Sequence, residues 1–235
     1  MLFRDLEAHA ECVYSQSGED GALACLFEKM GERGRYFVEF GAKDGLKDSN
    51  TANLRLNAGW SGLLMDGAPP VSNSKAEGFL SDVSGARVQQ EFVDVENVNS
   101  LFARYSVPKE FDLLSIDIDG NDYWVWDALV DFQPRVVVIE YNIFFAPEER
   151  CTIPYNPTHR WDETAYHGAS LGALSALGNQ KGYELVYTDP YAPNAFFVKR
   201  EALPSDWSEV TLDRAARWGT LKAPPDPQQR PWLSV

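Results

Sequence analysis

The stretch YFVEFGAKDG, Tyr36 to Gly45, decides the fold. An apolar strand carries the acidic Glu39 and runs into Gly41 and Gly45, which are four residues apart. Glycines here let the chain turn tightly after the strand and let the backbone approach a ligand closely. The dinucleotide-binding spacing G-x-G-x-x-G is absent, so a nicotinamide or flavin site is not supported. The motif predicts a ligand-binding loop; a plain strand-to-helix turn is the alternative.

Apolar runs and amphipathic stretches alternate on both sides of this motif. The runs LLSID and VVVIEY are nearly continuous apolar residues, as in strands buried on both faces. The predicted strands are Tyr36–Gly41, Gly62–Asp66, Arg87–Val93, Asp112–Asp117, Arg135–Tyr141, Tyr183–Thr188 and Ala195–Lys199. The predicted helices are Glu19–Gly31, Thr51–Ala58, Val98–Tyr105, Tyr123–Val130 and Leu171–Lys181. This alternation predicts an α/β fold with a seven-stranded, mostly parallel sheet and helices on both faces.

The composition narrows the class of protein. The 235 residues are 44% hydrophobic and 24% charged, as in one globular domain with a full core. The net charge of −14 repels phosphate backbones and anionic lipids, so neither nucleic acid nor a membrane is an expected partner. No secretory signal is visible, and three widely spaced cysteines suit a reducing compartment, so a cytoplasmic location is expected. A homo-oligomer stays open.

Acidic residues follow the strands beyond the glycine loop. Asp66 ends the second strand, about 20 residues after the loop, where a carboxylate accepts hydrogen bonds from ribose hydroxyls. A turn aspartate before Gly67 is the alternative interpretation of the same residue.

A cluster of polar side chains is predicted where the fourth and fifth strands end. Its members are Asp117, Asp119, Asn121, Asp122, Glu140 and Asn142. Carboxylates so close together repel one another unless a cation, a proton or a substrate relieves them. A divalent cation (Mg²⁺, Mn²⁺ or Ca²⁺) bound by Asp117, Glu140 and Asn142 is one interpretation. The other is that Asp119 or Asp122 caps the following helix.

The segment Ile143–Ala169 has no clear periodicity, and a loop this long inside a compact domain is usually functional. Because it follows the fifth strand, we expect it to overhang the carboxyl edge of the sheet, where open α/β sheets bind ligands. Two of the three histidines lie on it, and imidazole is a natural base near neutral pH. His167 is the preferred base, with Asp117 and Asp119 as the other candidates.

Four stretches, in this order, resemble the FkbM-like group of class I S-adenosylmethionine-dependent methyltransferases. They are YSQSGEDG (Tyr14–Gly21), FVEFGAKDG (Phe37–Gly45), GWSGLLMDGAP (Gly59–Pro69) and SIDIDGND (Ser115–Asp122). Two details depart from that group: Asp66 stands where Glu is commoner, and DIDGND stands where D-x-E-G-x-E is usual. The resemblance implies a Rossmann-like class I methyltransferase fold, whose final hairpin, turning at DPYAPN (Asp189–Asn194), inserts one antiparallel strand.

The resemblance also implies a function: S-adenosylmethionine as cofactor and O-methylation of a small polar acceptor such as a sugar or natural product. The implied cofactor contacts are Gln16, Glu39, Gly41, Asp66, Asp94, Val95 and Asp117. In that arrangement Asp94 and Val95 face the adenine, and Gln16 lies near the cofactor carboxylate. Ser17 as the N-cap of the first predicted helix is the alternative role for the SQSGED stretch.

We expect one domain over residues 1–201 and a C-terminal extension over residues 202–235, which is Pro-rich near its end. Two rival functions stay open. One is a non-catalytic nucleoside-binding or scaffold domain on the same fold, because fold alone does not imply activity. The other is an enzyme that uses the sulfonium without methyl transfer.

Overall fold

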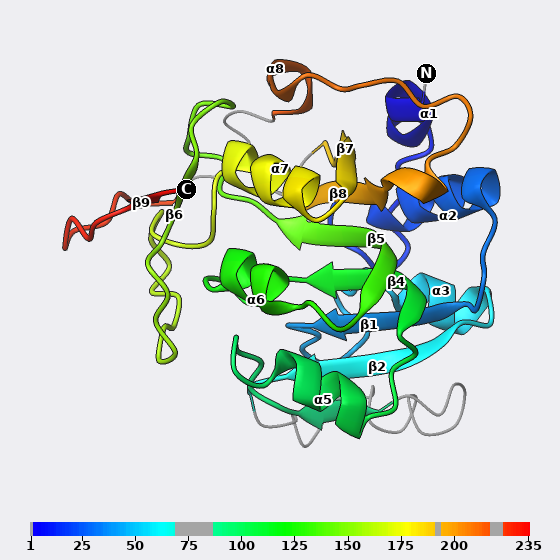
Figure 1. Ribbon diagram of the computed structural model, residues 1–235, viewed down its shortest axis with the longest axis horizontal. Coiled ribbons are helices and arrows are strands. Elements are labelled where there is room, and N and C mark those ends of the chain that lie inside the picture. Colours follow the sequence, from blue (N-terminus) through cyan, green and yellow to red (C-terminus); the bar gives the residue numbers. More distant parts are fainter. Residues whose placement is uncertain (1, 69–86, 191–193, 217–222) are drawn as a thin grey trace.

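Seven strands form one central sheet in the computed structural model, which describes residues 2–68, 87–190, 194–216 and 223–235 (Figure 1). The strands are β1 (Tyr36–Phe40), β2 (Ser61–Asp66), β3 (Val88–Gln90), β4 (Glu110–Ile116), β5 (Gln133–Glu140), β7 (Tyr183–Thr188) and β8 (Asn194–Lys199). Their order is β3-β2-β1-β4-β5-β8-β7, and β8 runs antiparallel to both of its neighbours. The predicted α/β fold with a final antiparallel hairpin strand is confirmed. Residues 191–193 of its turn lie outside the described residues.

Helices cover both faces of the sheet. On one face lie α1 (Leu2–Ala8), α2 (Glu19–Met30) and α3 (Ala52–Asn57); on the other lie α5 (Val98–Arg104), α6 (Asp122–Ala128) and α7 (Leu171–Gln180) (Figure 1). The sequence predicted all of these except α1, whose apolar residues are buried against α2 and β7. The remaining elements are short: β6 (Cys151–Thr152), η1 (Arg200–Ala202), α8 (Leu212–Ala215) and β9 (Leu233–Ser234). No described helix has both the length and the apolarity to span a bilayer.

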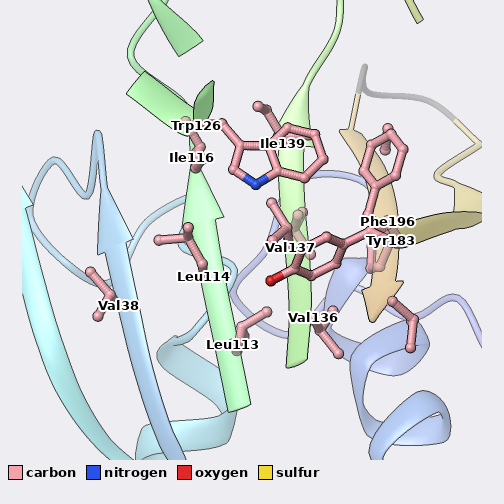
Figure 2. Close-up of a cluster of buried hydrophobic side chains, with 14 of the residues drawn as sticks. Val38, Leu113, Leu114, Ile116, Trp126, Val136, Val137, Ile139, Tyr183 and Phe196 are labelled. Atoms are coloured by element: carbon pink, nitrogen blue, oxygen red, sulfur yellow. The ribbon is translucent and has the colours of Figure 1, made fainter. Parts of the chain in front are cut away.

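The core is centred on β4 and β5, whose apolar side chains are buried on both faces of the sheet (Figure 2). From α6, Trp126 packs on Tyr183 and Phe197, with ring centroids 5.9 and 5.0 Å apart. The parallel pairing of β4 with β5, with Ile116 opposite Ile139, places the carboxyl ends of the two strands beside each other. Asp117 and Glu140 stand at those ends.

Carboxylates organise the loop before α2. The N-cap residue is Gly18, with a φ of 102°. The Asp20 carboxylate accepts hydrogen bonds from the backbone amides of residues 13–15 at 2.7–2.9 Å, and Glu19 accepts one from the amide of Ser17 at 2.6 Å. The predicted Ser17 cap is wrong: its hydroxyl has no hydrogen-bond partner within the described ranges, because these two carboxylates already bind the loop backbone.

Candidate functional site

A cavity of about 510 Å³ opens at the carboxyl edge of the sheet, between the ends of β1 and β4. The chain runs outward from β1 to β3 and then returns to β4 on the other side of β1, so the strand order reverses here. Open α/β sheets bind ligands at this point, and the volume lies within the roughly 300–1,000 Å³ of small-molecule sites. We call Gly41, Lys43, Asp66, Asp117 and Asp119 the floor of the cavity, and His159, Arg160 and Trp161 its roof.

Gly41 brings the glycine loop against β4. Its φ is 76°, and a Cβ there would lie 1.5 Å from the carbonyl oxygen of Asp117. The two strand ends are also joined by a hydrogen bond of 3.2 Å from the Asp117 amide to the Phe40 carbonyl. Glycine is therefore required by the close approach of two backbones as well as by the positive φ.

Asp66 ties the end of β2 to the glycine loop. One carboxylate oxygen accepts a hydrogen bond from the Lys43 amide, and the other accepts one from the Ala68 amide, both at 2.7 Å. Each carboxylate oxygen has two lone pairs, so both retain one position for a further donor. Because Asp66 lines the cavity, a ligand hydroxyl can reach those positions.

Glu39 has a structural role behind the floor. Its buried carboxylate accepts hydrogen bonds from the Ser49 hydroxyl at 2.8 Å, the Asn50 amide at 2.9 Å and the Thr51 hydroxyl. Burial raises the pKa of Glu39, although these hydrogen bonds oppose the shift. The side chain fixes the segment that leads into α3, and it is not among the described residues that line the cavity.

Three other residues with implied cofactor contacts also lie outside the cavity wall. Asp94 accepts hydrogen bonds from two backbone amides just before α5, each at 2.9 Å. The backbone of Val95 contacts the Tyr155 side chain from the long loop. Gln16 is exposed on the loop before α2. Near Asp94, the aromatic ring of Phe92 lines the cavity.

Asp117, Asp119 and Glu140 form an acidic cluster, with one oxygen from each carboxylate lying within 4.8 Å of the others. Asp117 and Asp119 line the cavity, and Glu140 lies behind them at the end of β5. Burial and the neighbouring carboxylates raise the pKa of both Asp117 and Glu140 well above the usual range, while Lys43 opposes the shift. The structure thus brings together the strand-end acids that the sequence indicated.

Two polar residues predicted beside this cluster have side chains that are hydrogen-bonded to backbone groups. Asp122 accepts hydrogen bonds from two amides of the loop before α6, both at 2.8 Å. The N-cap of α6 is Asn121, so the predicted caps at Asp119 and Asp122 are wrong. The Asn142 amide donates to two carbonyls of the long loop at 2.8 and 2.9 Å, and its oxygen accepts a backbone amide at 2.9 Å. Asn142 therefore holds the base of the loop.

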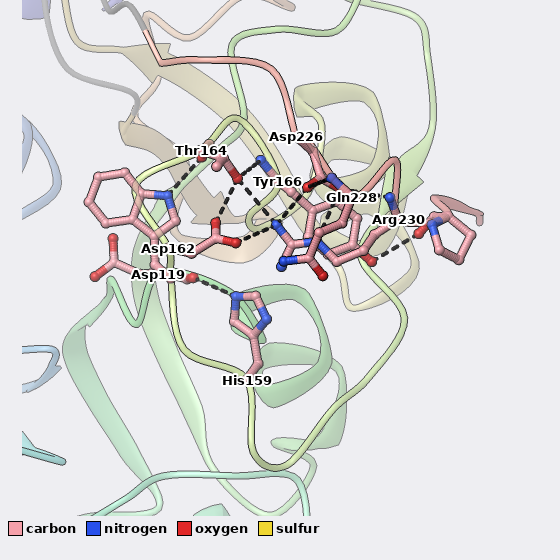
Figure 3. A network of polar contacts seen from close by, with 10 residues as sticks. Asp119, His159, Asp162, Thr164, Tyr166, Asp226, Gln228 and Arg230 are labelled. Atoms are coloured by element: carbon pink, nitrogen blue, oxygen red, sulfur yellow. Dashed lines mark hydrogen bonds and ion pairs between the residues drawn. The ribbon is translucent and has the colours of Figure 1, made fainter.

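The two histidines of the long loop lie at different depths. In the roof, His159 places Nε2 3.2 Å from the Asp119 carbonyl, and burial lowers its pKa (Figure 3). Behind the floor, His167 is 10% exposed, with Nδ1 3.6 Å from Oε2 of Glu140 and its ring against Trp161. Burial lowers the pKa of His167, and the nearby carboxylates oppose that shift. The preferred base therefore faces the acidic cluster and is not one of the described cavity-lining residues.

Contacts with the floor side hold the roof from within. The Asn121 side chain donates to the Asn156 carbonyl at 2.8 Å, and the Arg160 guanidinium lies 4.2 Å from the ring centroid of Phe92. Sequence reasoning placed the loop at this edge but did not assign Arg160 a role in the cavity. The only available signal was the concentration of aromatic and histidine residues on the loop.

Residues 223–235 hold the roof from outside. Strand β9 pairs with β6 of the long loop. Arg230 forms ion pairs with Asp162 at 2.6 Å and Asp226 at 3.0 Å, and its guanidinium lies 4.1 Å from the ring centroid of Tyr166 (Figure 3). Trp232 packs on the same tyrosine at 4.9 Å between centroids. No pattern in the sequence indicated this contact.

No protein-family model and no curated protein matches the chain, so the resemblance to the FkbM-like group stays a prediction. Similar solved structures include SeMet-substituted CurJ carbon methyltransferase, at 12% identity and a TM-score of 0.49 over 79% of this chain and 56% of that one. An O-methyltransferase family protein from Burkholderia thailandensis is 10% identical, with a TM-score of 0.47 over 76% of this chain and 56% of that one. Small RNA methyltransferase HEN1 is 11% identical, with a TM-score of 0.48 over 91% of this chain and 26% of that one. The match thus spans about half of the first two chains and a quarter of the third, and at these identities and TM-scores it assigns no activity.

Proposed function

We propose that the chain is an S-adenosylmethionine-dependent methyltransferase of the FkbM-like group that methylates a small polar acceptor, with a sugar or natural-product hydroxyl as the first candidate. The pairing of Gly41 with Asp66 on the cavity floor carries this proposal. A nucleoside cofactor needs a backbone that it can approach closely and a carboxylate for its ribose hydroxyls. Gly41 supplies the first, and Asp66, at the end of the next strand, supplies the second.

The residues of the cavity fit this cofactor. The backbone that begins at Gly41 would hold the methionyl part, and Asp66 keeps lone pairs for two hydroxyls. Phe92 offers an aromatic face to the adenine. The carboxylates of Asp117 and Asp119 create a negative field, which favours a cationic sulfonium over a neutral ligand.

When bound, S-adenosylmethionine supplies a methyl group carried on sulfur; the chain positions the acceptor and takes its proton. Asp117 faces the cavity, and burial raises its pKa, which makes it a stronger base near neutral pH. We assign it the proton of the acceptor hydroxyl, with Asp119 beside it. His159 and Trp161 line the roof of the same cavity and would shield this position from water. His167, one layer behind, acts through the cluster.

Calorimetric titration with S-adenosylmethionine and with its demethylated product tests the cofactor. Both should bind at one site, and Asp66→Ala should weaken binding about tenfold to a hundredfold, because a charge-assisted hydrogen bond is worth roughly 1.5–3 kcal/mol. Asp131→Asn, which neutralises an exposed acid outside the cavity, is the matched control and should bind normally.

Two results would argue against the proposal in different ways. Failure of the folded chain to bind either nucleoside would remove the cofactor assignment. Binding with no methyl transfer to any member of a panel of sugars and hydroxylated small molecules, followed by mass spectrometry, would favour the non-catalytic nucleoside-binding alternative.

A further inference from the structure

Two buried atoms beside the acidic cluster face each other without a hydrogen bond. Oε2 of Glu140 and Nδ1 of His167 are both inaccessible to solvent and have no hydrogen-bond partner in the part of the chain that the structure describes. They lie 3.6 Å apart, which is too long for a hydrogen bond between them. Buried polar atoms are almost always satisfied, so this pair needs an explanation.

The neighbouring Asp122 shows how the chain satisfies a buried carboxylate when no ligand is involved. Both of its oxygens accept backbone amides of the loop before α6 at 2.8 Å. Glu140 comes from the next strand and has no comparable amide at Oε2 among the described residues. Its unsatisfied oxygen and the imidazole nitrogen of His167 therefore remain available to a ligand.

We propose that Asp117, Asp119, Glu140 and His167 bind one divalent cation. Two atoms bound to the same ion at ~2.1–2.5 Å lie about 3–5 Å apart. The 4.8 Å limit that contains the three carboxylate oxygens falls in this range. His167 lies outside that group of three, but its Nδ1 is 3.6 Å from Glu140, which is also in the range. Asp119 thus replaces Asn142 in the ligand set that the sequence indicated.

The donor atoms indicate which ion fits best. Mg²⁺ and Ca²⁺ take oxygen ligands, whereas imidazole suits transition metals. Carboxylates suit Mg²⁺, Ca²⁺ and Mn²⁺, and Mn²⁺ is the transition metal among them, so we take it as the best match to three carboxylates with one imidazole. The charges agree, because a divalent ion leaves one net negative charge on three ionised carboxylates. Lys43, whose charge acts on both Asp117 and Glu140, balances it.

Binding of the ion does not depend on methyl transfer, although its role does rest on the proposed function. Asp117 and Asp119 line the cavity, so an ion that they share would be reachable by an acceptor hydroxyl. Such an ion lowers the pKa of a bound hydroxyl, which makes its proton easier to remove. It also lowers the pKa of Asp117, so activation by the ion would replace the base role that we assign to Asp117 in the ion-free chain.

Titration of Mn²⁺ into chelator-treated protein, followed by the electron paramagnetic resonance of the free ion and by calorimetry, tests the site. We expect one ion per chain, and an affinity at least about tenfold lower in Asp119→Asn and in Glu140→Gln. Asp131→Asn is again the charge-matched control and should bind normally, and circular dichroism checks that each variant folds. The proposal would be overturned if no one-to-one complex formed, or if both cluster variants bound Mn²⁺ as tightly as the wild type.

Pulsed paramagnetic resonance of the Mn²⁺ complex tests the histidine. Modulation from a directly bound imidazole nitrogen should be present in the wild type and in His159→Gln, and absent in His167→Gln. Its persistence in His167→Gln would overturn the role of His167, and equally tight Mg²⁺ binding would overturn the preference for Mn²⁺. None of these readouts needs the cofactor, so a failure here is distinct from a failure to bind S-adenosylmethionine.

Discussion

The floor and the roof of the cavity are built in different ways. Gly41, Asp66 and Asp117 stand at the ends of adjacent parallel strands, whose register is set by side chains buried in the core. The roof lies on a loop that is held by surface contacts to a remote part of the chain, such as the 2.9 Å hydrogen bond from Tyr166 to the Pro231 carbonyl. The part that binds and the part that covers can therefore be altered separately.

Gly41→Ala should break the floor and have the largest effect. The new Cβ would meet the Asp117 carbonyl at 1.5 Å, and neither strand can shift without losing the β1–β4 pairing. We expect the free energy of unfolding, measured with urea, to fall by about 3 kcal/mol or more. Gly59→Ala is the matched control. Its φ is 71°, but beyond its chain neighbours no described atom lies within 4 Å of the added Cβ, so we expect the free energy of unfolding to fall by only about 1–2 kcal/mol. Equal losses of stability in the two variants would show that the positive φ, and not the close approach of the two backbones, sets the cost at Gly41.

A fall in pH should change the stability contributed by the acidic cluster and that contributed by the segment holding the roof in opposite directions. Because the pKa values of Asp117 and Glu140 are raised, the folded chain binds their protons more tightly than the unfolded chain. Without a cation, their contribution to stability should rise as the pH falls from neutral toward the ordinary carboxyl pKa of about 4. In the C-terminal segment that holds the roof, hydrogen bonding to Arg230 lowers the pKa of Asp226 from 3.8 to about 2. The contribution of Asp226 is present above pH 3.8 and is lost as the pH falls through about 2.

Comparison with a variant whose acidic cluster has lost two charges isolates the first of these effects. Urea unfolding of metal-free protein at neutral pH and at about pH 5 should show a gain in the wild type relative to Asp117→Asn/Glu140→Gln. An unchanged difference between the two proteins over this range would contradict the burial of ionised carboxylates in the acidic cluster.

Arg230→Ala should loosen the roof and leave the floor intact, with the smallest effect on global stability. Partly exposed ion pairs contribute up to ~1 kcal/mol each, so we expect a loss of about 1 kcal/mol. Amide hydrogen exchange over residues 156–167 should accelerate about tenfold or more, while exchange in β4 stays slow. Arg200→Ala is the control, because Arg200 pairs with Glu184 at 2.6 Å beside β7. Equal exchange in the two variants would show that Arg230 does not hold the roof.

The sequence predicted the floor better than the roof, for physical reasons. Apolar runs, a glycine after the first strand and acids after the next strands are local patterns, and parallel strands bring their carboxyl ends together. Two cap predictions failed where carboxylates bind loop backbone: the Ser17 cap, and the caps at Asp119 and Asp122. The predicted strand Arg87–Val93 was too long, since the observed β3 covers Val88–Gln90. The contact of the roof with residues 223–235 depends on two-residue strands, which leave no periodicity to read.

The pairing of β6 with β9 also orders the events of folding. The floor also joins distant segments, with Phe37 opposite Leu113, but all of them are synthesised before residues 223–235, which contact Tyr166 through the Pro231 carbonyl. The β1–β4 floor needs none of those C-terminal residues, so it can form while the roof is still open. A ligand that binds the open floor stabilises the half-formed chain by mass action. A ligand present during synthesis would then be enclosed once residues 223–235 hold the roof in place.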